Sequence, residues 1–406
     1  MSRKLTILSV LDGFSFGGDE NRVLQLVQAI DRERFDFRVA TIRPNDVNVD
    51  RIYGNLRGEF ERAGVSVVDL SVPRVTRGLA LNDPRRHVLR IGLLVGTVAR
   101  IARYVRRERI DVIDGHHGAG YLAGTIAGVV TGVPSLLTTY NVSETWHPRW
   151  LWNAMHRTTL AVSRAVVTDS DAVADVLRSW MLPQHRERVR VIPNGPPPPI
   201  AECSEAEVRA KLGLAPRDET RVVGQIAALA PGKGQHLLLE AAPAVLERHP
   251  DVTFLIVGFE RRGTGYADVL RARARELGIS DRVIITPYQG KIGDVWQTVD
   301  IHAHPTMQDS LPNAILEGMS LGKPLVASAH AGIPTLVLQD RTGIVVPVDD
   351  AQAVARGLVR LLDQPEVARA FGEAARERYL TGYTREHLAR RMEEVFVQVA
   401  ASRSRD

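Results

Sequence analysis

Cysteine and long apolar runs are almost absent from this chain of 406 residues. The one cysteine, Cys203, has no second cysteine with which to form an internal disulfide, and structural disulfides belong to oxidising compartments. No apolar run approaches the ~20 residues that a transmembrane helix needs. The amino-terminal run "LTILSVL" meets Asp12 and Gly13 too soon for a signal peptide. We therefore expect a cytoplasmic protein, for which peripheral contact with a membrane stays open.

Aromatic residues are also few, at 5% of the chain, and no finger, homeodomain or RNP motif is present. The net charge is +5, and most of the basic residues are arginines. A positive surplus suits nucleic acid, an anionic membrane surface or phosphate-bearing ligands. Because the motifs and aromatic residues of nucleic-acid readers are missing, we expect no nucleic-acid partner.

Short apolar runs that alternate with helical segments make up most of the chain. In the helical segment 19–31, for example, Val23, Leu26, Val27 and Ile30 share one face. Alternation of strands and helices predicts parallel sheets with helices on both sides. The runs that predict strands are 4–11, 37–42, 65–70, 111–115, 134–140, 165–170 and 189–194, then 221–229, 252–258, 282–286, 300–305, 324–328 and 343–348.

Four consecutive prolines at 196–199 separate two halves of this pattern. Prolines in a row can neither continue a helix nor sit inside a sheet, so they indicate a boundary between domains. The sequence predicts an α/β protein with two doubly wound Rossmann-like domains, 1–195 and 196–383, and a helix at 384–406 that returns to the first domain. Ligands bind at the carboxyl ends of the strands in such sheets, so we expect the site in a cleft between the two domains.

A basic amphipathic segment follows residue 84. Val95, Ile101 and Val105 belong to its apolar face, and Arg100 and Arg103 lie largely off that face. A helix of this kind can lie on an anionic membrane or cover a sheet with its outer face in water. The strand predicted at 111–115 follows at once, which favours the covering helix.

Two glycine-containing loops each stand between a predicted strand and a predicted helix. Gly17 and Gly18 allow backbone N–H groups to approach a phosphate or a sugar, without the spacing of a dinucleotide or P-loop fingerprint. In the second half, Lys233 lies between two glycines at the start of a helix, where its ammonium can contact a diphosphate.

Two acids frame the start of a helix in "QDSLPNAILEGMSLGKPLVAS", residues 308–328. Pro312 suits the first turn of that helix, whose N-terminal N–H groups can face an anion. Asp309 lies in the preceding loop, within reach of a substrate hydroxyl. Glu317 lies between one and two turns inside the helix, where it can accept hydrogen bonds from a vicinal diol such as a ribose. A diphosphate, a diol and a second hydroxylated group together describe a sugar nucleotide.

These motifs resemble the donor-site signature of retaining glycosyltransferases of family 4, the glycogen-synthase-like group with the glycosyltransferase-B (GT-B) fold. The resemblance rests on "VDIHAHPT", "DSLPNAILEGMSLGKPLVAS" and "HAGIPTLVLQDRTGIVVPVDD", in that order. "SFGGDE" is similar to the N-terminal glycine loop of the family, "DVIDGHH" to its His-x-His segment, "VIPNG" to its interdomain boundary and "APGKG" to its lysine loop.

The resemblance implies transfer of a sugar from a nucleoside diphosphate sugar to an acceptor hydroxyl with retention, without a metal or other cofactor. Small-molecule, glycan and lipid-linked acceptors all fit the family, and its members close their two domains over the donor. The residues implied for catalysis are His116, Lys233 and Asp309. Those implied for the donor are Gly17, Gly18, Lys233, Asp309, Ser310, Leu311, Pro312, Asn313 and Glu317, with Lys233 at the diphosphate, Glu317 at the ribose and Asp309 at the sugar.

Several positions depart from the family pattern. Ala228 stands where the family usually has an arginine, and one lost charge-assisted contact to phosphate costs about 1.5–3 kcal/mol. Asp309 is shorter than the usual glutamate, and Asp114 replaces the first histidine of the usual pair. Arg261 and Arg262, which follow a strand of the second sheet, are candidates to replace the missing arginine.

The acceptor is expected on the first domain, near "TYNVSETWHPRWLW". Tyr140 stands where the family often has a histidine, and Trp146 can stack on a sugar or an apolar acceptor; packing of the tryptophans against the sheet is an equal alternative. Two other functions stay open. One is a sugar-nucleotide or partner-binding protein that has lost catalysis, and the other is a sugar-nucleotide epimerase of the same architecture.

Overall fold

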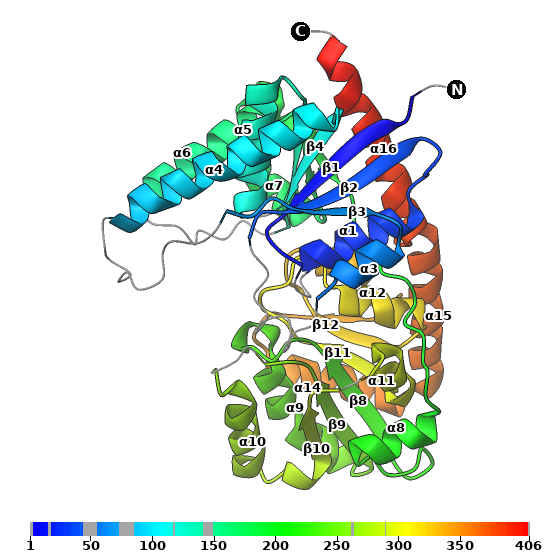
Figure 1. Cartoon of the computed structure of the whole chain (residues 1–406). Coiled ribbons are helices and arrows are strands. Elements are labelled where there is room, and N and C mark those ends of the chain that lie inside the picture. The colour runs from blue at the N-terminus through cyan, green and yellow to red at the C-terminus, as the bar shows by residue number, and fades with distance from the viewer. Residues whose placement is uncertain are drawn as a thin grey trace. The chain divides into compact units, whose positions relative to one another are not determined.

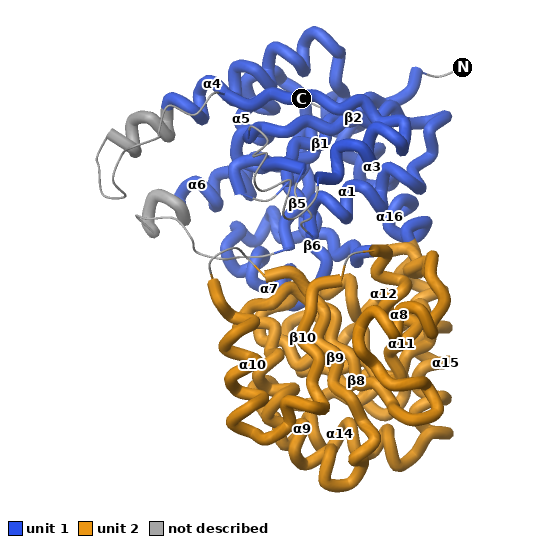
Figure 2. The backbone as a smooth tube through the Cα atoms, turned by 60° about the horizontal axis from the view of Figure 1, so that its bottom comes forward, with its two compact units in different colours: residues 1–194, 385–406 blue, residues 195–384 orange. Residues whose placement is uncertain are grey.

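A computed structural model describes the backbone in eight stretches, with the side chains of 85–91, 149–153 and 404 outside the description. The stretches are 3–14, 18–43, 55–72, 85–116, 118–140, 149–260, 264–288 and 290–404. The chain forms two compact units, Met1–Asn194 with Arg385–Asp406, and Gly195–Thr384 (Figure 2). The boundaries predicted from the sequence, after 195 and after 383, each differ by one residue from this division.

Unit 1 is built on a seven-stranded parallel sheet with the strand order β3-β2-β1-β4-β5-β6-β7 (Figure 1). The predicted strands all form, each shifted by no more than a few residues, because short apolar runs bury well on both faces of such a sheet. Their bounds are β1 Leu5–Leu11, β2 Phe35–Thr41, β3 Ser66–Asp69, β4 Val112–His116, β5 Ser135–Thr138, β6 Ala165–Thr168 and β7 Val189–Val191.

Helices cover both faces of this sheet (Figure 1). On one face, α1 and α16 share a core with the sheet, and the four residues predicted as the apolar face of segment 19–31 are all buried. On the other face, α4 and α5 enclose a second core. The helices are α1 Gly18–Ala29, α3 Arg57–Arg62, α4 Arg85–Arg107, α5 Ala119–Thr131, α6 Arg149–Val162, α7 Asp171–Trp180 and α16 Arg385–Ala401, with short 3-10 turns at Pro183–Arg188 and Ser402–Ser404.

The basic amphipathic segment forms α4, which packs against α5. Ile101 and Val105 are buried as predicted, and Arg100 and Arg103 are exposed. The prediction for Val95 is wrong: its side chain is 63% exposed, because the face of α4 that reaches the core passes through its neighbour Leu94, about 100° away around the helix. None of the helices in the described stretches has the length and apolar content to span a bilayer.

Unit 2 repeats the architecture with a six-stranded parallel sheet in the order β10-β9-β8-β11-β12-β13. Its strands are β8 Arg221–Ile226, β9 Val252–Val257, β10 Val283–Thr286, β11 Ile301–His304, β12 Leu325–Ser328 and β13 Ile344–Val346. Its helices are α8 Glu205–Leu212, α9 Gln235–Arg248, α10 Tyr266–Glu276, α11 Ile292–Thr298, α12 Asn313–Ser320, α13 Ile333–Leu336, α14 Ala351–Asp363 and α15 Pro365–Gly382, with 3-10 turns at Pro231–Lys233 and Ser280–Arg282.

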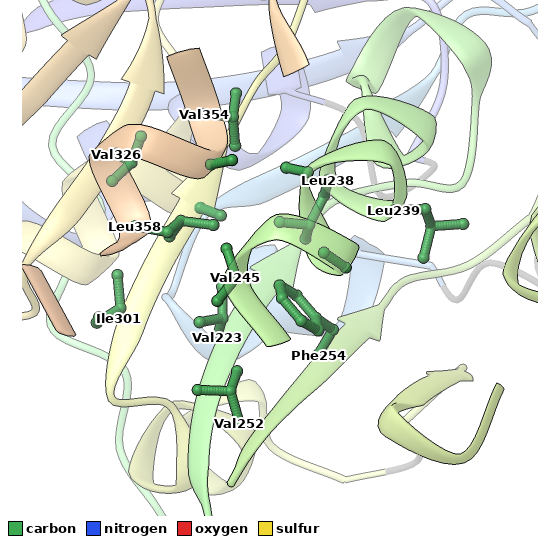
Figure 3. Close-up of a cluster of buried hydrophobic side chains, with 14 of the residues drawn as sticks. Val223, Leu238, Leu239, Val245, Val252, Phe254, Ile301, Val326, Val354 and Leu358 are labelled. Atoms are coloured by element: carbon green, nitrogen blue, oxygen red, sulfur yellow. The ribbon is translucent and has the colours of Figure 1, made fainter. Parts of the chain in front are cut away.

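The largest core of unit 2 lies under α9 and α14 (Figure 3). Leu238 and Val245 of α9 and Leu358 of α14 meet Val223 and Phe254 from the sheet, and all five side chains are fully buried. This packing confirms the doubly wound fold predicted for both halves. In each sheet the strand order reverses beside the first strand, between β1 and β4 and between β8 and β11, and ligands of such sheets bind at the carboxyl ends of the strands at this point.

The proline-rich segment after Asn194 is held against unit 2 by buried side chains. The Tyr379 hydroxyl donates to the carbonyl of Pro196 at 2.7 Å. The Asp294 carboxylate accepts the backbone N–H groups of Glu202 at 2.7 Å and of Cys203 at 2.9 Å. The segment therefore belongs structurally to unit 2 along most of its length.

Candidate active site

Two loops of unit 2 meet at the carboxyl ends of β8 and β11. The backbone N–H of Met307 and the hydroxyl of Thr306 both donate to the carbonyl of Gly232, at 2.8 and 3.1 Å. Gly234 has a φ of +71°, and a Cβ there would lie 1.9 Å from the carbonyl oxygen of Pro305. Only glycine fits this position, so the lysine loop rests directly on the loop that follows β11.

This contact brings Lys233 and Asp309, which are 76 residues apart in sequence, into an ion pair. The other carboxylate oxygen of Asp309 lies 3.1 Å from Nε2 of His304, whose side chain is almost completely buried. Burial of the Asp309 carboxyl opposes its ionisation. The hydrogen bond with His304 and the charges of His304 and Lys233 outweigh that effect and hold the pKa of Asp309 well below its usual range. The carboxylate is therefore ionised at neutral pH.

Two fully buried glutamines fix the backbone of the lysine loop. Nε2 of Gln225 donates to the carbonyl of Lys233 at 2.7 Å, and Nε2 of Gln235 donates to the carbonyl of Ala228 at 2.8 Å. Ala228 itself is exposed. Its methyl group supplies no charge at the position where the family usually has an arginine.

Helix α12 presents its N-terminus beside these loops. Pro312 is the N-cap residue and the helix begins at Asn313, so the prediction that placed Pro312 in the first turn is wrong by one position, because its ψ of 128° is extended. Oδ1 of Asn313 is buried and has no hydrogen-bond partner among the described residues. Leu311 is buried in the core below, and the carbonyl of Ser310 accepts the N–H of Gly332 at 3.0 Å. Leu311 can therefore meet a ligand only through its backbone.

Glu317 lies just over one turn inside α12, within the one to two turns predicted, and the residue is partly buried. Burial raises the pKa of Glu317, and a hydrogen bond opposes that rise: Nε1 of the fully buried Trp296 donates to Oε2 at 3.1 Å. One oxygen is thereby fixed, which leaves Oε1 to receive a ligand hydroxyl.

A second histidine lies beneath this site. The fully buried His302 ring packs edge-on against Trp296 at 4.9 Å between ring centroids and against His304 at 5.4 Å. Burial, with a smaller effect of His304, lowers the pKa of His302 well below its usual value, so the ring is neutral. The sequence reasoning missed both histidines, although their spacing of two in a strand places them on one face.

Unit 1 has its own polar cluster at the carboxyl ends of β4 and β5. Nε2 of His116 lies 3.0 Å from Oδ2 of Asp114, and the Thr138 hydroxyl donates to the other oxygen, Oδ1, at 2.7 Å. All three side chains are buried. Nδ1 of His116 has no hydrogen-bond partner among the described residues. The aspartate that replaces the usual histidine thus orients the ring of His116.

Tyr140 lies near this cluster, and the buried side chain of Arg22 stacks over its ring. The sequence did not predict a role for Arg22. The guanidinium of Arg22, in α1, lies 5.1 Å from the centre of the Tyr140 ring and donates to Oδ1 of Asn194 at 2.8 Å. Burial raises the pKa of Tyr140 well above its usual value. Gly18 is the first residue of α1. Gly17, Trp146, Arg261 and Arg262 lie outside the described residues.

Comparison with models of protein families identifies the family to which the chain belongs. Residues 17–195 match the family described as "Glycosyl transferase 4-like domain", and residues 207–378 match "Glycosyl transferases group 1". The chain belongs to the GT-B glycosyltransferases. The two matches together span most of both units, without β1 and α16, and they confirm the family predicted from the motifs.

Three relatives of this glycosyltransferase illustrate the range of the family. D-inositol 3-phosphate glycosyltransferase of Segniliparus rotundus is 32% identical over 42% of this chain and 38% of its own length. 2-Deoxystreptamine glucosyltransferase of Streptomyces kanamyceticus is 26% identical over 70% of this chain and 76% of its own. A GDP-mannose-dependent phosphatidylinositol monomannoside mannosyltransferase of Mycolicibacterium smegmatis is 32% identical over 43% of this chain and 46% of its own. The glycosyltransferase thus spans less than half of the length of two of these three relatives.

Solved structures show the same fold. A glycosyltransferase from Rickettsia africae superimposes with a TM-score of 0.79 at 16% identity, over 98% of this chain and 99% of its own. HepE of Anabaena, solved in complex with UDP and glucose, gives a TM-score of 0.78 at 20% identity, over 97% of this chain and 99% of its own. At these identities the likeness concerns the fold alone.

Proposed function

We propose that this glycosyltransferase transfers a sugar from a nucleoside diphosphate sugar to an acceptor hydroxyl with retention of configuration, without a metal ion. The observation that carries the proposal is the convergence of Lys233, Asp309 and Glu317 at the carboxyl ends of β8 and β11. There a cation, two carboxylates and the N-terminus of α12 lie together on one sheet edge.

Each group suits one part of a sugar nucleotide. The ammonium of Lys233 and the dipole of α12 stabilise the negative charge that develops on the leaving diphosphate, which is the main electrostatic task of the reaction. Glu317, with one oxygen held by Trp296, accepts a hydrogen bond from the ribose diol. Asp309 orients the sugar, and the departing phosphate takes the proton of the acceptor hydroxyl. HepE was solved with UDP and a relative uses GDP-mannose, which makes these two bases the first to test.

The acceptor half of the site is proposed on unit 1, around His116 and Tyr140 together with Trp146. The relatives act on D-inositol 3-phosphate, 2-deoxystreptamine and phosphatidylinositol monomannoside, which supports a small-molecule or lipid-linked acceptor. Trp146→Ala is expected to weaken the binding of the acceptor more than that of the donor. Equal loss of both affinities would instead indicate misfolding.

The test is calorimetric titration of the protein with UDP, GDP, ADP and TDP in turn. We expect one of them to bind, and we expect Glu317→Ala to abolish that binding. Glu373→Ala, which removes an exposed carboxylate from α15 in the same unit, is the matched control and should bind as the wild type does. Binding of none of the four nucleotides would refute the proposed donor site.

One observation favours a second candidate function. Ala228 leaves the donor loop without the usual arginine, which suits a protein that binds a sugar nucleotide or a protein partner without turnover. Product analysis separates the candidates: incubation with the bound sugar nucleotide and a panel of acceptors gives a new glycoside, an epimerised sugar nucleotide or unchanged substrate.

A further inference from the structure

The carboxylate of Asp309 is shared between two hydrogen-bond partners of different mobility. Lys233 holds one oxygen and His304 the other, at 3.1 Å from its Nε2. The side chain of Lys233 is 26% exposed, whereas that of His304 is 2% exposed. A lysine ammonium on a flexible stem can swing to a new partner, while a ring packed in the sheet cannot.

The surroundings of His304 fix its ring. The residue is the last of β11, paired with Ala327 of β12, and its ring packs against that of His302. Neither ring nitrogen of His302 has a hydrogen-bond partner among the described residues, so His302 does not share the carboxylate of Asp309. His304 is thus a stationary hydrogen-bond partner for Asp309.

The proposed donor places a diphosphate within reach of Lys233, and two phosphate charges attract the ammonium more strongly than one carboxylate does. When Lys233 turns to the diphosphate, Asp309 keeps its negative charge in a largely buried position. A buried carboxylate without a partner is costly, and it would also be free to rotate away from the sugar.

We propose that His304 is a positioning residue that holds the carboxylate of Asp309 ionised and aimed at the donor sugar once Lys233 has moved to the diphosphate. This inference rests on the proposed function. Lys233 pairs with Asp309 in the empty site and with phosphate in the loaded site. His304 keeps a hydrogen bond to Asp309 in both states, so the buried carboxylate never lacks a partner. His304 therefore affects the binding of the sugar, and Lys233 affects the binding of the whole nucleotide.

The test compares two ligands in each variant. The nucleoside diphosphate that the wild type binds is titrated first, then the tightest-binding of its glucose, mannose and N-acetylglucosamine derivatives. His304→Leu is expected to leave the Kd of the nucleoside diphosphate within about twofold and to raise the Kd of the sugar nucleotide about tenfold or more, as loss of a charge-assisted hydrogen bond does. Lys233→Ala is expected to weaken both ligands.

His304→Gln provides a variant that keeps an N–H donor in place of Nε2. We expect its Kd for the sugar nucleotide to lie between those of the wild type and His304→Leu. In the background Asp309→Asn, the substitutions of His304 should no longer change this Kd, because a neutral amide needs no fixed partner. Equal weakening of both ligands by the His304 variants, no weakening of either, or an undiminished effect in the Asp309→Asn background would overturn the inference. Failure of the wild type to bind any nucleoside diphosphate would instead refute the proposed function.

Discussion

Replacing Glu317 by glutamine should make the glycosyltransferase more stable at neutral pH while it removes nucleotide binding. Burial raises the pKa of Glu317, and the hydrogen bond from Trp296 only partly opposes that rise. A carboxyl group whose pKa is raised in the folded state favours folding fully below its unfolded pKa of about 4.3. That contribution is lost as the pH rises through the folded-state value, so ionised Glu317 lowers the free energy of unfolding at neutral pH.

The size of the effect follows from linkage. Each unit by which the pKa is raised corresponds to ~1.4 kcal/mol of unfolding free energy at high pH. Unit 2 comprises Gly195–Thr384, a size at which each kcal/mol shifts Tm by about 2–4 °C. Glutamine keeps the shape of the side chain, and its carbonyl can accept the N–H of Trp296, so little packing is lost. We therefore expect Glu317→Gln to raise the Tm of unit 2, by about 3–6 °C for each unit by which the pKa of Glu317 is raised.

The assay is thermal unfolding by calorimetry at several values between about pH 5 and about pH 8. The difference between Glu317→Gln and the wild type should be largest at the alkaline end and should narrow as the pH falls. Glu373→Gln, at an exposed position on α15, is the control and should show no such trend. A lower Tm for Glu317→Gln at the alkaline end, or a difference independent of pH, would refute the reasoning.

Three further predictions concern the same site. Trp296→Phe removes the N–H that donates a hydrogen bond to Glu317, so the Kd of the bound nucleoside diphosphate should rise about tenfold in calorimetric titration. An unchanged Kd would show that this hydrogen bond does not orient the carboxylate of Glu317. Gly234→Ala would place a Cβ 1.9 Å from the carbonyl oxygen of Pro305, so it should lower the free energy of chemical unfolding by at least ~3 kcal/mol. Gly213 has a similar φ of +72° but nothing within 4 Å of a Cβ, so Gly213→Ala should cost only about 1–2 kcal/mol. Equal costs for the two variants would contradict the close contact at Gly234. Sugar transfer should be unaffected by EDTA, and a loss of product that Mg²⁺ restores would contradict a metal-independent reaction.

The strands and the assignment of Lys233 and Asp309 to one donor site were the parts that the sequence could predict. Each strand is a short apolar run bounded by turn residues, and a sheet buried on both faces requires that pattern. Lys233 and Asp309 follow strands that are adjacent in the sheet, and the carboxyl ends of parallel strands lie along one edge. The strand-loop-helix pattern placed each residue at the end of a strand and the family resemblance assigned both to the donor site, whereas the ion pair between them was not predicted.

The partners of the site residues were not predictable in the same way. The hydrogen bond between Trp296 and Glu317 depends on how α11 packs beside α12, which no periodicity expresses. Arg22 lies in α1 next to the apolar residue Val23, and it is buried in part because α16 reaches it: its guanidinium lies 4.0 Å from the sulfur of Met392. Such contacts join helices that are far apart in the chain, and no pattern within either segment predicts which helix it will contact.

The position of α16 has a consequence for the order in which the protein can fold. This helix follows unit 2 in the chain, yet its buried Leu388, Met392 and Phe396 complete the core of unit 1. At synthesis rates of about 5–20 residues per second, the ribosome needs roughly 10–40 s to produce the intervening residues Gly195–Thr384. During that time the part of α1 and of the sheet that α16 covers has no partner, whereas unit 2, a continuous stretch of chain, can fold as soon as it emerges. The half of the molecule that is made first is thus the half that is finished last, and a chaperone that shields α1 would act in this interval.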